Sequence, residues 1–87
     1  MTATEYVSVV DSGIRSYVQD MSRALEPRDR FTRDYLETEA LVRISTLPGD
    51  VDRKTILRSV ASIMLQRTTG GRKDLRRAKS VIKKYVS

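Results

Sequence analysis

The 87-residue sequence contains no cysteine, no histidine and no tryptophan. Without cysteine the chain has neither disulfide bonds nor a thiolate metal site. Without histidine it lacks the most common general base and metal ligand of proteins. Because small secreted domains usually depend on disulfide bonds, we expect an intracellular protein, located in the cytoplasm, a nucleoid or a nucleus, with no metal and no cofactor.

Long apolar runs and catalytic motifs are missing as well. The longest uncharged run, from Ser59 to Gln66, is far shorter than the roughly 20 apolar residues that cross a bilayer. The N-terminus has no basic region followed by an apolar one, so we expect no signal peptide. No phosphate-binding loop ends in Gly-Lys-Ser/Thr, and no metal-ligand spacing occurs. The sequence therefore predicts that the chain is not an enzyme, and it disfavours a membrane partner.

Aromatic residues are few, so a core must be mainly aliphatic. Hydrophobic residues make up 39% of the chain and charged residues 32%, which is typical of a soluble globular protein. A chain of this length forms one compact domain. We predict a single helical domain over residues 1–87.

Turn-forming residues divide the chain into four segments, at Glu26-Pro27, at Pro48-Gly49-Asp50 and at residues 68–71. Within each segment the apolar residues recur at helical spacing. The sequence therefore predicts an all-α fold, a compact orthogonal bundle of four helices. The predicted core residues are Val7, Val10, Ile14, Tyr17, Val18, Met21 and Leu25; Leu36, Ala40, Leu41, Ile44 and Leu47 in a helix from about 29 to 45; Ile56, Leu57, Val60, Ala61 and Met64; and Leu75, Ala78, Ile82 and Tyr85 in a helix over about 72–86.

The first segment permits two interpretations. Thr2 and Glu5 fit a helix capping box, and the apolar spacing continues across Gly13. Residues 6–10, however, are rich in β-branched side chains and resemble a short strand before a turn. The continuous spacing favours one helix, with a strand followed by a helix as the alternative.

Positive charge is concentrated in the last quarter of the chain. Residues 1–66 carry nine Lys/Arg and ten Asp/Glu, whereas residues 67–87 carry eight Lys/Arg and only Asp74 as an acid. Such asymmetry indicates contact with nucleic acid or another anionic surface. The basic residues of this last part are Arg67, Arg72, Lys73, Arg76, Arg77, Lys79, Lys83 and Lys84.

In the helix predicted over about 72–86, these cations occupy the arc opposite the apolar one. Like charges four residues apart repel each other, so a helix selected for stability alone would also carry glutamates. Arg72 and Lys73 occupy the first turn, where the helix dipole favours acids, and Asp74 offsets them only in part. We predict that bare amides and basic side chains at this N-terminus bind a phosphate.

The third segment offers a second polar surface. Lys54 and Arg58, with the hydroxyl residues Thr55, Ser59 and Ser62, are residue types that contact phosphates and bases. With the preceding apolar helix, the run from 48 to 58 resembles, over about 25 residues, the turn and second helix of helix-turn-helix proteins. That resemblance implies a helix placed in the major groove of DNA. An ordinary helical hairpin with a hydrated face is the alternative.

The leading hypothesis is a small basic nucleic-acid-binding protein, a regulator or packaging and accessory factor, with DNA favoured over RNA. The alternative is a protein–protein interaction adaptor that binds an acidic partner, with the apolar run Ile63-Met64-Leu65 as its anchor. A homo-oligomer is compatible with both. The predicted contact residues are Arg67, Arg72, Lys73, Arg76, Arg77, Lys79, Lys83, Lys84, Lys54 and Arg58.

Overall fold

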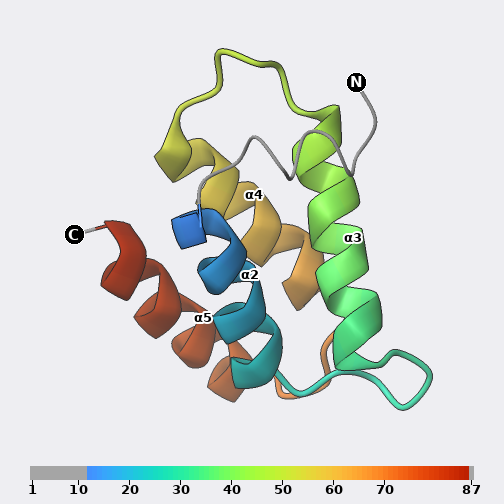
Figure 1. Ribbon diagram of the computed structural model, residues 1–87. Coiled ribbons are helices and arrows are strands. Elements are labelled where there is room, and N and C mark those ends of the chain that lie inside the picture. The colour runs from blue at the N-terminus through green and yellow to red at the C-terminus, as the bar shows by residue number, and fades with distance from the viewer. Residues whose placement is uncertain (1–11, 87) are drawn as a thin grey trace.

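The computed structural model describes residues 12–86, which form four helices packed against one another (Figure 1). The helices are α2 (Ser12–Ala24), α3 (Arg33–Thr46), α4 (Arg53–Leu65) and α5 (Arg72–Val86). The described part of the chain contains no strand, only an isolated bridge between Pro27 and Thr68. The predicted all-α four-helix bundle is therefore confirmed. The predicted capping box of Thr2 and Glu5, the alternative strand at residues 6–10 and the predicted burial of Val7 and Val10 lie outside the described residues.

Side-chain caps set where α3 and α4 begin. The hydroxyl oxygen of Thr32 accepts a hydrogen bond from the Tyr35 N–H at 3.1 Å, and the Asp52 carboxylate accepts one from the Thr55 N–H at 2.7 Å. Such caps satisfy backbone donors that have no partner within the helix. Because the cap is Thr32, α3 begins at Arg33. The predicted start near residue 29 was therefore too early.

Two helices, α2 and α4, each pack against all three others. Their buried residues join those of α3 and α5 in one hydrophobic cluster. The prediction for the core is confirmed for Ile14, Tyr17, Val18, Met21, Leu25, Leu36, Ala40, Ile44, Ile56, Leu57, Val60, Ala61, Met64 and Ala78, while Leu41, Leu47, Ile82 and Tyr85 pack against the cluster half-buried. The predicted burial of Leu75 is wrong, because its side chain is 44% exposed. The neighbouring Asp74 is fully buried instead.

The apolar run at the end of α4 turns mainly inward. Met64 is fully buried, and Ile63 and Leu65 are half-buried and pack against the core. A central helix accommodates three consecutive apolar residues because neighbours cover several of its sides.

No helix in the range 12–86 combines the length and apolarity needed to span a membrane.

Tyrosine side chains fix α4 and α5 to α2. The buried Tyr17 hydroxyl donates to the Leu57 carbonyl at 2.6 Å, and burial raises the pKa of Tyr17, so this group remains a protonated donor. The Tyr17 ring also meets the Tyr85 ring edge-on, with 5.4 Å between centroids. The Tyr85 hydroxyl donates to the carboxylate of Asp20. These contacts hold the C-terminal half of α5 in place relative to α4.

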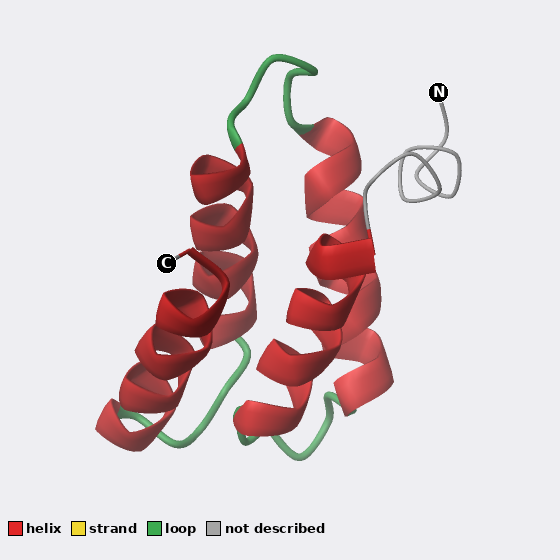
Figure 2. Cartoon of the chain, turned by 60° about the vertical axis from the view of Figure 1, so that its left-hand side comes forward, coloured by secondary structure: helices red, strands yellow, loops and turns green. Residues whose placement is uncertain are grey.

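The loop between α2 and α3 and the loop between α4 and α5 lie together at one end of the bundle, opposite the α3–α4 loop (Figure 2). The Arg28 N–H donates to the Arg67 carbonyl at 3.1 Å, and the Thr69 N–H donates to the Glu26 carbonyl at 2.9 Å. We call this pair of loops, with the first turn of α5, the closed end. Backbone hydrogen bonds thus tie distant parts of the chain together where α5 begins.

Candidate functional site

The N-terminus of α5 already holds an anion, the carboxylate of Asp74. This side chain is fully buried and accepts hydrogen bonds from the Gly70 N–H at 2.7 Å and the Glu26 N–H at 3.2 Å. The Lys73 N–H donates to the Gly70 carbonyl at 3.1 Å. The Gly70 and Lys73 amides are therefore engaged within the fold, while phosphate binding at this N-terminus stays a prediction. An acid in the first turn stabilises the helix dipole, and here it also stabilises two loops.

The glycine pair before α5 serves this carboxylate. A Cβ atom on Gly70 would lie 2.3 Å from the Asp74 Cγ, which is far inside van der Waals contact. Gly71 has a φ of 57°, in the left-handed region that glycine adopts at little cost. Packing and backbone conformation thus account for both glycines without a bound ligand.

Three of the predicted contact residues, Arg67, Arg77 and Lys84, are paired with acids. Arg77 lies 3.0 Å from the Glu26 carboxylate and 3.4 Å from that of Asp74, and its hydrogen bond to Glu26 raises its pKa. Arg67, in the loop before α5, also forms an ion pair with an acid.

Arg67 lies 3.2 Å from the Glu39 carboxylate, and this hydrogen bond raises the pKa of Arg67. Its guanidinium also lies 5.5 Å from the Phe31 ring centroid, within the range of a cation–π contact. The pairing of Lys84 with Asp20 is looser, at 3.8 Å. These pairs offset the charge of three of the ten predicted contact residues.

The other seven predicted contact residues are exposed and form no ion pair with any acid among residues 12–86: Arg72, Lys73, Arg76, Lys79, Lys83, Lys54 and Arg58. Four of the seven line a single groove of about 500 Å³ between α4 and α5. Lys54 and Arg58 come from α4, whereas Lys79 and Lys83 come from α5. We call this the cationic groove.

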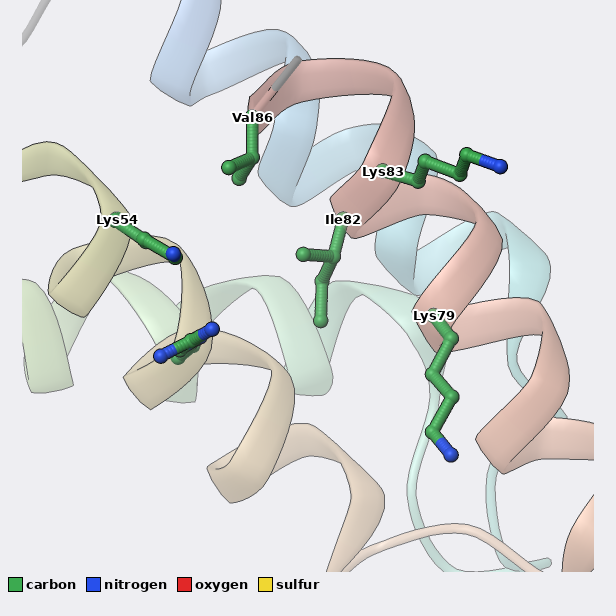
Figure 3. Close-up of a pocket in the computed structure, with 6 residues that line it drawn as sticks. Lys54, Lys79, Ile82, Lys83 and Val86 are labelled. Carbon is green, nitrogen blue, oxygen red and sulfur yellow. The ribbon is translucent and has the colours of Figure 1, made fainter.

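The side chains of the cationic groove have different directions (Figure 3). Lys54 extends from α4 into the space between the helices, and Ile82 and Val86 extend from α5 toward it. Lys79 and Lys83 point outward from α5 in separate directions. The floor is therefore apolar and the rim is charged. Since the amino groups diverge, they do not converge on one small anion.

A neighbouring hollow of about 330 Å³ extends the groove along α4. It shares Lys54 and Val86 with the cationic groove and adds Leu57, Tyr85 and Arg53. Arg53 was not among the predicted contact residues. Its position beside Lys54 in the chain was the only available signal, because the approach of α4 to α5 is a property of the tertiary structure.

A second question for the described region is whether its side chains could bind a metal ion. No group of three acidic residues between residues 12 and 86 is placed to hold a metal ion. Comparison with protein-family models, with curated proteins and with solved structures found no match to this chain.

Proposed function

We propose that this chain binds nucleic acid and that the cationic groove between α4 and α5 contacts the phosphate backbone. The observation that carries the proposal is the gathering of Lys54, Arg58, Lys79 and Lys83 around one groove, without an ion pair to a carboxylate of the described chain. Cations of this kind replace the counterions that surround a nucleic acid, and the release of those counterions drives binding.

The spread of the charges favours a polymer over a small anion. Lys79 and Lys83 point in separate directions from α5 (Figure 3), so each can meet a different phosphate of an extended backbone. The exposed residues Arg72, Lys73 and Arg76 lie on the same helix and lengthen the charged surface. Such a module fits a regulator or a packaging factor, with DNA favoured as the ligand.

The adaptor hypothesis has less support than nucleic-acid binding. Its anchor was the apolar run at the end of α4, in which Met64 is fully buried and Ile63 and Leu65 pack against the core. A hot spot of a protein interface needs a side chain that is free to enter a pocket of the partner. The anchor of that hypothesis is largely engaged within the fold.

A fluorescence anisotropy titration of labelled duplex DNA over a range of salt concentrations tests the proposal. Each phosphate contact contributes about −0.9 to the slope of log K against log salt, so the four cations of the groove contribute about −3.6. Replacing both α5 residues of the groove, Lys79→Gln with Lys83→Gln, should weaken binding and make the slope shallower by about 1.8.

The matched control changes the same amount of charge elsewhere. Arg23 and Arg33 are exposed and do not line the cationic groove, so Arg23→Gln with Arg33→Gln should leave the slope nearly unchanged. Circular dichroism confirms that each variant is folded. Absence of binding by the wild type, or equal losses in the two double variants, would overturn the proposal.

A further inference from the structure

A strip of uncharged polar side chains runs along the outer surface of α4 and its end. Thr55, Ser59, Ser62 and Gln66 follow one another at intervals of four, three and four residues, so they share one face of the helix. Thr55, Ser62 and Gln66 are exposed and Ser59 is half-buried. We call these four residues the polar strip. No acid occurs within α4 itself.

Cations lie along both edges of the polar strip. On one edge, Lys54 and Arg58 belong to the cationic groove shared with α5. On the other edge, a hollow of about 220 Å³ between α3 and α4 is lined by Arg43 of α3 together with Ser59, Ser62, Ile63 and Gln66. Figure 1 shows α3 and α5 on either side of α4. The strip is thus neutral in the middle and flanked by positive charge from two different helices.

We propose that α4 reads the base sequence of duplex DNA from the major groove, an inference that rests on the proposed function. Ser59, Ser62 and Gln66 would meet base edges, because hydroxyl and amide groups both donate and accept hydrogen bonds. Arg43 contacts the phosphates of one strand, and the cationic groove contacts those of the other. This assignment gives a role to Arg43 and Gln66 that the charge pattern of the sequence does not reveal.

The dimensions agree with this placement. The major groove of B-DNA is about 12 Å wide and admits one α-helix. The axes of packed helices lie about 8–10 Å apart, so cations carried by α3 and α5 fall beyond the groove, above its phosphate walls. A neutral centre and two charged edges are the arrangement that base reading with phosphate contacts on both sides requires.

The acids near α4 restrict which part of the helix approaches DNA. Asp50 and Asp52 both precede α4, and the carboxylate of Asp52 accepts the hydrogen bond from the Thr55 N–H. Negative charge at this end repels phosphates. The segment from Arg58 to Gln66, at the end of α4, carries no acid and therefore forms the reading surface, with Thr55 at its margin.

Selection of bound sequences from a library of random duplexes tests the inference. Wild-type protein should enrich one sequence motif, since each good bidentate base contact discriminates by roughly 5- to 150-fold. The triple variant Ser59→Ala, Ser62→Ala and Gln66→Ala should lose that motif. Its affinity for unselected duplex and its salt slope should stay within about twofold of the wild type, because phosphate contacts carry no sequence information.

A matched triple variant on α3 controls for the loss of polar groups. Thr38, Ser45 and Thr46 are polar residues of α3 that do not line the hollow beside α4, and their hydroxyls donate to carbonyls of their own helix. Replacing all three with alanine should leave the selected motif intact. Arg43→Gln should weaken binding to every sequence alike and make the salt slope shallower by about 1.

The outcomes separate this inference from the proposed function. Salt-dependent binding without any enriched motif, or a motif that survives in the α4 triple variant, overturns base reading and leaves nucleic-acid binding intact. Failure of the wild type to bind any duplex at low salt overturns both.

Discussion

The closed end of the bundle and the cationic groove contain the same residue types in opposite electrostatic settings. At the closed end, Arg77 donates to Glu26 and to the buried Asp74. In the groove, Lys79 and Lys83 come from the same helix but have no ion pair to any acid in the range 12–86. A basic helix is therefore not one uniform surface. Its residues divide into those that hold the fold and those that are available to a ligand.

A count of charges along the helix does not separate these two groups of cations. An arginine that is bonded to carboxylates has fewer N–H donors left for a phosphate, and the neighbouring acids offset part of its charge. Lysines that repel one another along a helix without compensation cost stability. Such a cost is typical of positions that serve function, and in this chain it falls on the groove.

The largest effect on stability is expected from Asp74 at the closed end. Replacement of Asp74 with alanine leaves the N–H groups of Gly70 and Glu26 without their buried acceptor. The expected loss is about 3 kcal/mol in the free energy of unfolding, or about 12–24 °C in Tm for a domain of this size. Thermal unfolding followed by circular dichroism measures it. The comparison fails if Lys79→Gln with Lys83→Gln destabilises the chain as much as Asp74→Ala does.

A smaller effect is expected from Gly70, which touches the same carboxylate. Gly70→Ala places a Cβ atom against Asp74 and should lower the free energy of unfolding by about 1–3 kcal/mol, the usual cost of overpacking. Gly49 is the control, since a Cβ atom there would meet no atom within 4 Å. Denaturant unfolding of Gly70→Ala and Gly49→Ala measures the difference. Equal unfolding midpoints would show that the Cβ atom at Gly70 does not clash with Asp74.

The smallest effect is a pH dependence at Asp52, the acid whose charge interacts with Lys54 and Arg58 beside the groove. Hydrogen bonds from Thr55 and these two cations hold the pKa of Asp52 below its ordinary value. A lowered pKa in the folded state stabilises the fold above the unfolded pKa of about 3.9, and that contribution is lost as the pH falls through the folded pKa.

Asp52→Asn keeps an N-cap acceptor and removes the titration. The wild type should therefore be slightly more stable than this variant at pH 7, and the gap should close as the pH falls below about 4. Melting curves over that range provide the measurement. A gap that stays constant down to about pH 2 would show that the charge of Asp52 contributes nothing.

The helices were predictable from sequence because apolar spacing and turn residues are local signals. Leu75 was wrongly assigned to the core, and the burial of Asp74 was not predicted. A helical wheel places Leu75 at the edge of the apolar arc, but the buried amides of Gly70 and Glu26 attract the carboxylate. The amide of Glu26 comes from another part of the chain, but Asp74 shares the helix face of Ala78, Val81 and Tyr85, so the sequence did contain a local signal for its burial.

The site was predictable only as a set of residues. Lys54, Arg58, Lys79 and Lys83 were expected to contact a ligand, and the structure brings them to one groove. Arg67 and Arg77 belonged to the same predicted set, yet each pairs with an acid at least 28 positions away in the chain. Which cations are neutralised depends on tertiary partners, and a sequence pattern does not contain them.

Chemical-shift mapping by NMR during titration with duplex DNA distinguishes the two regions, because one experiment reports on the closed end and on the cationic groove at once. We expect the largest shifts on the groove residues Lys54, Arg58, Lys79 and Lys83 and on Ser59, Ser62 and Gln66 of the polar strip, while Glu26, Arg67 and Arg77 change little. Shifts that are largest on Glu26, Arg67 and Arg77, or that are distributed evenly over the surface, would contradict this expectation.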